Sequence, residues 1–199
     1  MSWFDVPGIV WRIFYSLAED TQSLGTFRLF VMMNAILKRR SIRKYAQTEV
    51  PDDLIKKLLE AGMSAPSAGN ERPWQFVVVK DKETLAKLAD ASPYAKMTKD
   101  APVAILVCGD LNLEHHQGFW VQDCSAATEN ILIEVEDLHL GAVWIGIYPV
   151  AERVEYLRKV LSIPNQVIPF ALIPVGYPAE TKVTPSRYDA SRVHYDRWA

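Results

Sequence analysis

Residues 65–79 read APSAGNERPWQFVVV, and they join two stretches of different character. The first stretch, Ser64 to Pro73, is rich in serine, proline, glycine and asparagine, which favour turns and loops. The second stretch, Phe76 to Val79, is apolar and mostly β-branched, which predicts a buried strand. Together they predict a loop that carries polar side chains and is held in place by a rigid sheet.

Two helices are predicted upstream of this loop. Asn34 is a good N-cap for a short helix through Leu37, and the basic residues 38–40 suit a helix end. The second helix begins at residues 51–53, Pro-Asp-Asp, and we expect Gly62 to end it. Its apolar residues fall on one helical face: Leu54, Ile55, Leu58 and Leu59.

Downstream of the loop, short apolar runs alternate with segments of helical periodicity. The further runs that predict buried strands are Val103–Cys108, Ala142–Ile145 and Phe170–Val175. The predicted helices are Lys82–Asp90, Phe119–His139 and Val150–Leu161. Strands separated by helices are typical of a layered α/β domain, although this pattern does not give the strand directions. The chain has no internal repeat and no interior linker, so we expect one domain.

The composition excludes several classes of function. The 199 residues are 49% hydrophobic and 23% charged, and the net charge of −2 provides no basic field that would attract nucleic acid. The sequence has no dinucleotide-binding glycine motif, P-loop, zinc-protease motif or hydrolase nucleophile elbow. Cys108 and Cys124 are too few for a disulfide framework, so we expect them to be core residues of a cytoplasmic protein.

A basic cluster is the first candidate for chemistry. Residues 39–45 read RRSIRKY, and in an extended or turning backbone Arg39, Ser41 and Arg43 can point to one side. Two guanidinium groups and a hydroxyl that converge in this way suit a phosphate group. Taken alone, the cluster is equally consistent with a solvated basic turn, and the loop at 65–74 with a plain helix-to-strand connection.

In this order and at this spacing, the two motifs resemble those of the nitroreductase family of FMN-dependent oxidoreductases. The basic cluster is followed about 20 residues later by Pro-Ser-Ala-Gly-Asn-x-x-Pro-Trp-x-Phe. The resemblance continues through residues 141–146, GAVWIG, and through Arg187 with residues 193–195, Val-His-Tyr. It therefore covers Met33 to Ala199, and we expect this segment to be an FMN-binding domain.

The resemblance implies an α+β fold, an α/β/α sandwich with a largely antiparallel central sheet. It also implies a homodimer that exchanges its C-terminal strands and holds two FMN molecules at the subunit interface. Arg39, Arg40 and Ser41 match the family's contacts to the flavin phosphate and ribityl chain. Arg43 matches the basic side chain near the N1 and C2 carbonyl edge of the flavin, and Arg187 matches a late basic residue on the phosphate.

The remaining site residues implied by the resemblance come from the loop and the third apolar run. Pro66, Ser67 and Asn70 match residues that reach the flavin from the partner subunit. Ile145 and Gly146 match the backbone segment whose N–H faces flavin N5. Arg72 stands where the family commonly has glutamine, so we expect no cofactor role for it.

The implied activity is ping-pong reduction. NAD(P)H would deliver hydride to flavin N5, and the reduced flavin would pass electrons to nitroaromatic, quinone or related small planar acceptors. Because the cofactor carries this chemistry, no acid/base pair in the protein and no metal are expected. Three alternatives stay open: reductive dehalogenation, flavin remodelling, and a non-catalytic flavin-binding module. The stretch Leu111 to Gly118 is expected to be a lid. Enzymes for reductive dehalogenation or flavin remodelling would differ from the main prediction in this lid.

Both ends of the chain lie outside the regular pattern. Residues 1–32 are rich in large apolar groups but contain no stretch long enough for a membrane span, and no signal peptide is expected. They are interpreted as an extension that packs on the core, contacts a membrane surface, or precedes a true start at Met33. The 23 residues from Tyr177 onward have no helical period, and we expect their β-forming triplet 193–195 to pair with the sheet edge of a second subunit.

Other polar and aromatic residues have more ordinary interpretations. His115 and His116 are expected on a lid or surface, since adjacent histidines do not easily share a metal. Trp120 is expected either to stack over the flavin or to lie in the dimer core. Three polar residues of the long helix are expected to face the interface or solvent: Asp123, Glu129 and Asn130.

Overall fold

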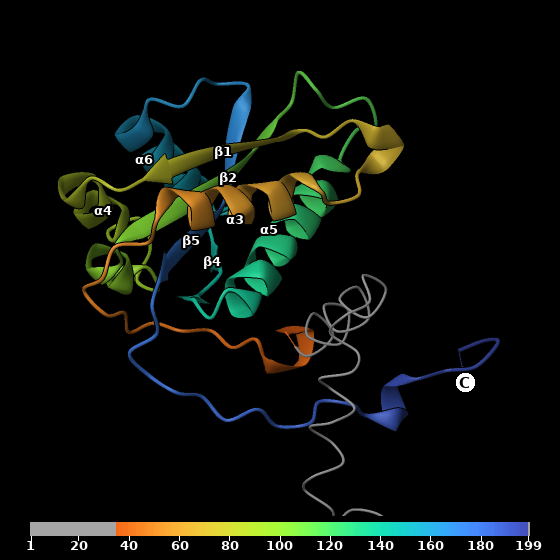
Figure 1. The fold of residues 1–199 in the computed structure, drawn as a ribbon. Helices are drawn as coiled ribbons and strands as arrows, with labels where there is room; N and C mark the ends of the chain where they lie inside the picture. The colour runs from red at the N-terminus through yellow and green to blue at the C-terminus, as the bar shows by residue number, and fades with distance from the viewer. Residues whose placement is uncertain (1–34, 199) are drawn as a thin grey trace, which may run out of the picture.

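The computed structural model describes residues 35–198. Residues 35–38 are helical, in agreement with the short helix predicted through Leu37. The predicted cap Asn34, the extension 1–32 and its boundary at Met33 lie outside the described residues. The elements that follow form the layered domain shown in Figure 1.

The central sheet is antiparallel and is built on two long buried strands. Its order is β1 (Trp74–Val79), β2 (Val103–Asp110), β5 (Val167–Gly176) and β3 (Gly141–Ala142), and β4 (Ile145–Gly146) also pairs with β5. Every pairing between these strands is antiparallel. The strand directions, which the sequence pattern did not give, are therefore those implied by the family resemblance.

The third predicted strand, Ala142–Ile145, is divided in two. β3 and β4 keep one register against β5, because Ala142 pairs with Val175 and Ile145 pairs with Leu172. That register puts Pro174 opposite Val143. Proline has no backbone N–H to donate, so the ladder is interrupted at residues 143–144. The prediction of one continuous strand was wrong for this reason.

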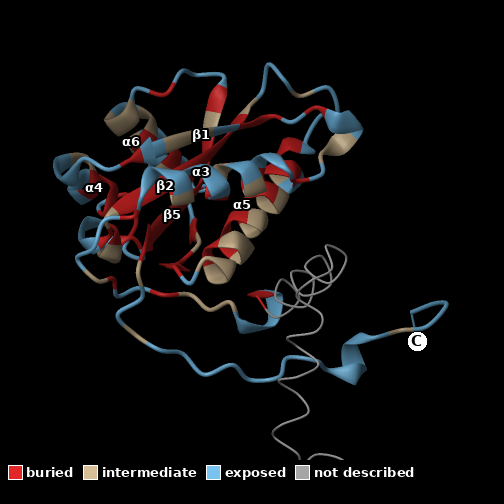
Figure 2. Ribbon diagram, in the orientation of Figure 1, coloured by how far each residue is buried: buried red, intermediate tan, exposed pale blue. Residues whose placement is uncertain are grey.

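Helices cover both faces of the sheet. α3 (Asp52–Met63) and α5 (Trp120–Asp137) lie over one face, and α4 (Lys82–Leu88) and α6 (Ala151–Leu161) over the other (Figure 1). Alternate residues of β2 enter the two resulting cores, Ile105 with α3 and α5, and Leu106 with α4 and α6. Figure 2 shows the sheet and the inner helix faces as the buried part of the molecule. The architecture is thus the expected α/β/α sandwich.

Gly62 has a different role from the predicted helix stop. α3 continues to Met63, and Gly62 is buried in its last turn. A Cβ at this position would lie 3.0 Å from Cδ1 of Ile131 on α5 and 3.2 Å from the ring of Phe76. The glycine therefore allows α3 to pack closely on α5 and β1.

Trp120 lies in the core of the chain. Its ring contacts Gly109 of β2 so closely that a Cβ there would collide with it. Tyr148 and Phe170 pack edge-on against the same ring, at centroid distances of 4.8 and 6.0 Å. Neither predicted role of Trp120, stacking on the flavin or forming the dimer core, agrees with this position, because its own chain already buries the ring.

The two cysteines are core residues, as predicted. Both thiols are buried, and Cys124 Sγ lies 3.6 Å from the carbonyl oxygen of Cys108. Burial raises the pKa of Cys108 to about 12 and raises that of Cys124 as well. Neither thiol therefore has the low pKa that marks a reactive cysteine.

The C-terminal segment leaves the sheet and runs along the molecule. Ala46 N donates to Tyr177 O and Ala179 N to Lys44 O, so the start of the segment is paired with residues 44–46. Beyond Glu180 the described chain is exposed except for the half-buried His194, and it forms one short turn, η3 (Ala190–Arg192) (Figure 2). Residues 193–195 form no strand in this single chain, since no neighbouring strand meets them. Strand exchange with a second subunit stays a prediction.

Candidate functional site

The basic cluster is anchored beside β3. Ser41 forms a parallel bridge with Ala142, and Ile42 N donates to Ala142 O at 2.8 Å. The buried Tyr45 hydroxyl lies 2.8 Å from Ile42 O and 3.2 Å from Pro174 O. These contacts hold the extended backbone predicted for the cluster, with Ile42 inward and Arg43 exposed.

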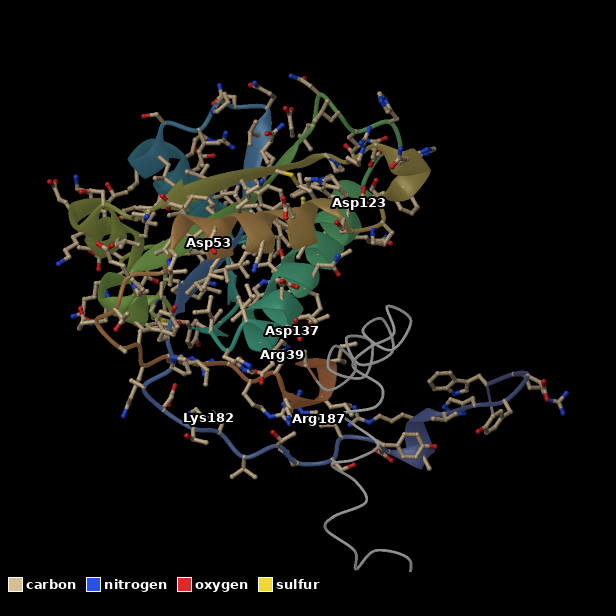
Figure 3. All side chains as sticks on the ribbon, in the orientation of Figure 1. Arg39, Asp53, Asp123, Asp137, Lys182 and Arg187 are labelled. Atoms are coloured by element: carbon tan, nitrogen blue, oxygen red, sulfur yellow. The ribbon has the colours of Figure 1, made fainter. Side chains whose placement is uncertain are left out.

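A pocket of roughly 460 Å³ lies between this cluster and the C-terminal segment. It is lined by three arginines, three hydroxyl residues and three apolar ones: Ile36, Leu37, Arg39, Arg40, Thr184, Pro185, Ser186, Arg187 and Tyr188. Figure 3 shows Arg39 and Arg187 on the two segments that border the pocket. Guanidinium and hydroxyl groups around one cavity provide donors suited to a phosphate. The structure thus brings Arg39, Arg40 and Arg187 together from distant parts of the chain.

Arg40 and Arg39 already have partners within the chain. Arg40 donates from Nη1 to the carbonyls of Leu37 and Arg39, and from Nε to that of Val183 at 3.2 Å. It therefore fixes the C-terminal segment to the cluster. Arg39 Nε lies 3.2 Å from Glu129 Oε1 on α5, and its side chain is only partly exposed. Glu129 is thus a partner of the cluster.

Arg43 stands apart from the pocket, and Ser41 is not among the residues that line it, so the structure does not show the predicted convergence of Arg39, Ser41 and Arg43. The Arg43 side chain is exposed, and its backbone N–H donates to Glu180 Oε1 at 2.6 Å. Hydrogen bonds from Lys182 and from the Arg43 N–H lower the pKa of Glu180, although burial opposes them. A carboxylate therefore lies beside this part of the basic cluster.

The β4 backbone is open to an incoming group. Ile145 is buried, but Gly146 is exposed, and no atom lies within 4 Å of the position that a Cβ would take there. Arg153 Nη1 donates to Gly146 O at 2.8 Å and helps to hold this segment in place. The free space beside Gly146 is what the close approach of a flat ring to the backbone requires.

The polar loop has a defined conformation and lies at the start of α5. Ala68 N donates to Asp123 Oδ1 at 3.0 Å, and Arg72 N donates to Ser67 Oγ at 3.0 Å. Gly69 and Asn70 form part of a short 3₁₀ turn with positive φ values of 53° and 60°. Pro66 and Asn70 are exposed, and Ser67 is half-buried. Two of the predicted contact residues therefore face outward.

Asp123 does not face solvent or an interface, contrary to our expectation. It is buried beneath the polar loop, close to Glu71, a residue that we did not single out. Glu71 Oε2 accepts hydrogen bonds from the backbone N–H of His115 and His116, so it joins the loop to residues 111–118. A lone glutamate between Asn70 and Arg72 carries no sequence signal for such a role.

The two predicted halves of the site lie at opposite ends of α5. The polar loop contacts Asp123 in the first turn of this helix, whereas Ser41 meets Ala142 just beyond its last turn. Figure 3 shows Asp123 at one end of α5 and Arg39 near Asp137 at the other. An 18-residue helix is roughly 27 Å long. Within a single chain, Pro66, Ser67 and Asn70 therefore lie far from the arginine pocket.

Within the described residues, neither a metal site nor a membrane-spanning helix is found. No group of three or more histidine, cysteine or acidic residues could hold a metal ion in residues 35–198. In the same part of the chain, no helix has both the length and the apolar character needed to cross a membrane.

Comparison with known proteins agrees with this geometry. A protein of Methanothermobacter thermautotrophicus, provisionally named NADH dehydrogenase/NAD(P)H nitroreductase, is 54% identical over 167 residues, covering 84% of this chain and 87% of that protein. An FMN-dependent nitroreductase from Clostridium difficile has a TM-score of 0.78 at 31% identity, over 83% of this chain and 99% of the other. A provisionally assigned nitroreductase from Desulfovibrio desulfuricans, solved in complex with FMN, has a TM-score of 0.73 at 31% identity, over 84% and 98%. The model of the nitroreductase family matches residues 36–93 and 91–177, and the chain belongs to that family.

Proposed function

We propose that this protein is an FMN-dependent oxidoreductase that uses NAD(P)H to reduce nitroaromatic, quinone or related small planar acceptors. The observation that carries the proposal is the pocket in which Arg39 and Arg187 converge, in a chain whose relatives include a nitroreductase solved with FMN. We also propose a cytoplasmic location, which the two buried thiols support.

The residues present fit FMN. Arg39 and Arg187 would bind the phosphate, with Ser41 on the ribityl chain and Arg40 fixing the wall of the pocket. The free space beside Gly146 leaves room for the flavin ring against the backbone of β4. Ile145 and Gly146 would then present a backbone N–H to N5, as proposed from the resemblance.

A second copy of the chain would complete the site. Pro66, Ser67 and Asn70 lie at the far end of α5 from the pocket, so we assign them to the flavin bound mainly by the partner subunit. The exposed C-terminal segment, with Tyr195 and Trp198 both more than 80% exposed, would pack on the partner in the same dimer. We therefore propose a homodimer with FMN at the interface.

FMN, when bound, would supply the redox chemistry, namely acceptance of hydride from NAD(P)H and transfer of electrons to the second substrate. The protein binds and orients the partners and places charge in advance of reaction. Arg43 would stabilise the negative charge that the reduced ring carries near N1. Glu180, beside the Arg43 backbone, would moderate this effect by placing a carboxylate nearby.

The test is an anaerobic absorbance spectrum of the purified protein with NADH and then with NADPH. We expect about one FMN per chain and loss of the oxidised-flavin absorbance with at least one nucleotide. A flavin that stays oxidised would instead support a non-catalytic binding module. Release of FAD, or no uptake of FMN on reconstitution, would contradict the cofactor assignment. Comparing nitroaromatic, quinone and halogenated acceptors then separates reduction from dehalogenation.

A further inference from the structure

Two carboxyl groups are buried together where the polar loop, α5 and residues 111–118 meet. Glu71 is 8% exposed and Asp123 is 4% exposed. Glu71 Oε2 accepts from His115 N at 2.7 Å and from His116 N at 2.9 Å, and Asp123 Oδ1 accepts from Ala68 N at 3.0 Å. The other oxygen of each group, Glu71 Oε1 and Asp123 Oδ2, is buried without a hydrogen-bond partner.

Two ionised carboxylates are not expected in such a place, because burying unpartnered charges of the same sign is very unfavourable. Within residues 35–198, no lysine or arginine forms an ion pair with either group. The titratable side chains that act on the pair come from the lid: Glu114 raises the pKa of Asp123, and His116 lowers that of Glu71. Arg72, the next residue of the loop, is exposed.

We propose that Glu71 and Asp123 share one proton, which Asp123 Oδ2 donates to Glu71 Oε1, and that this pair holds the polar loop and the lid together. The polar loop here means residues 66–73 and the lid residues 111–118. One proton supplies the donor that both orphaned oxygens lack. Asp123 keeps it because Glu71 Oε2 already accepts two backbone N–H groups, which favour its ionised form.

The direction of both pKa shifts agrees with this assignment. Burial raises the pKa of Asp123, and the nearby Glu71 raises it further, against the opposing effect of the Ala68 N–H. Burial also acts to raise the pKa of Glu71, but the N–H groups of His115 and His116 outweigh it and leave that pKa below its ordinary value. Asp123 is therefore the acid of the pair and Glu71 the base.

The contact between loop and lid is direct as well. The His116 ring lies on Gly69, where a Cβ would collide with it, and Gly69 has a φ of 53°. The side chain of Glu114 accepts from the Gly118 N–H, so this hydrogen bond connects two residues within the lid. Glu71 thus connects a compact lid to the residues proposed to reach the flavin, Ser67 and Asn70.

If the proposed function holds, the pair is a positioning device for the flavin site. Two opposing contributions set the pH range of the closed form. Glu71, whose pKa is lowered, contributes stability that is lost as the pH falls through that lowered pKa. Asp123, whose pKa is higher in the closed form than when the pair is open, contributes stability that is fully present below its ordinary pKa. This stabilisation is lost as the pH rises through the raised pKa. Above it, both carboxylates are ionised and repel each other, so the loop and lid separate more often.

The experiment compares wild-type protein with Asp123→Asn, Glu71→Gln and the double variant. In either single variant an amide NH₂ donates permanently to the remaining carboxylate, so the pair forms without a shared proton. In the double variant, the amide oxygens remain on the backbone N–H groups and two NH₂ groups face each other without an acceptor. Asp100→Asn removes one exposed carboxylate between α4 and β2 and serves as the control.

The readouts are hydrogen exchange of the His115 and His116 amides, corrected for intrinsic rates, and Tm across pH. In wild type, lid opening should rise by up to about tenfold per pH unit between the ordinary and the raised pKa of Asp123, since one proton is released. In Asp123→Asn, lid opening should not change with pH. The Tm of this variant should exceed that of wild type by about 2–4 °C at the high-pH end. The double variant should fall more than about 4 °C below wild type at every pH.

The same pH dependence in wild type and Asp123→Asn, or a double variant as stable as either single one, would overturn the shared proton. These measurements require no flavin turnover. If the protein held no FMN, the proposed function would be wrong, but the hydrogen-exchange and Tm results for the carboxyl pair would be unaffected. Conversely, active enzyme with flat lid exchange would defeat only the pair. FMN affinity that falls with pH in wild type, but not in Asp123→Asn, would link the pair to the flavin site.

Discussion

The two ends of α5 use their polar groups in opposite ways. At the start of the helix, Glu71 and Asp123 are buried and accept hydrogen bonds from the lid and the polar loop. At the far end, Arg39 and Arg187 line an open pocket, and Arg39 is also paired with Glu129. Polar groups satisfied within the chain hold segments in place, whereas groups that border an open pocket are candidates for binding a ligand.

Removing the C-terminal segment should have the largest effect on FMN binding and on the dimer. Truncation after Tyr177 removes Arg187 and one wall of the pocket, so dimer and FMN should be lost together. Truncation after Tyr188 keeps Arg187 but removes residues 193–195, and should weaken the dimer more than the pocket itself. Sedimentation and flavin absorbance measure both properties. A soluble, yellow, dimeric product of the first truncation would show that the segment has no part in the site.

Replacing single arginines of the pocket should have the next largest effect on FMN binding. Arg39→Ala or Arg187→Ala should each weaken FMN binding by about 1.5–3 kcal/mol, the usual value of a hydrogen bond to a charged group. Arg192→Ala is the matched control, because Arg192 lies in the same segment but pairs with Asp189 outside the pocket. Fluorescence titration of the apoprotein with FMN gives the three affinities. An unchanged affinity in either variant removes that arginine from the phosphate site.

Filling the space beside Gly146 should affect binding without affecting the fold. No atom lies within 4 Å of a Cβ at this position, so Gly146→Ala should change the free energy of unfolding by less than about 0.5 kcal/mol. The same methyl group would occupy room assigned to the flavin ring, and FMN affinity should drop by about tenfold, or 1.4 kcal/mol. Denaturant unfolding of the apoprotein and FMN titration separate the two effects. Unaltered affinity would place the ring elsewhere.

The smallest effect is expected at Arg43. Its exposed side chain lies outside the pocket, so Arg43→Gln should leave FMN bound. Loss of a cation near N1 should make the flavin harder to reduce and lower its potential by roughly 20–40 mV, equivalent to about 1–2 kcal/mol for two electrons. A redox titration measures this shift, with Lys44→Gln as the control for a neighbouring charge. A wild-type potential would show that Arg43 is not close to the ring.

Several elements were predictable because their causes are local. Three features follow from helix-start and helix-stop residues and from apolar runs: the α3 start at Asp52, the buried β2 and β5 cores and the end of α6 at Leu161. The break at residues 143–144 was not predictable, because it depends on Pro174 of another strand. The burial of Trp120 likewise depends on Gly109, Tyr148 and Phe170, which come from distant segments.

The same distinction between local and tertiary causes applies to the candidate site. Arg39 and Ser41 could be proposed from a local motif, since charged and hydroxyl groups spaced along one extended segment already suggest an anion site. The pairing of Arg39 with Arg187 in one pocket, and of Glu71 with Asp123 beneath the lid, required the folded chain. Sequence carries composition, periodicity and local motifs. Burial and the availability of a hydrogen-bond partner arise only when distant segments pack together, and these two properties distinguish a binding arginine from a solvated one and a shared proton from two exposed carboxylates.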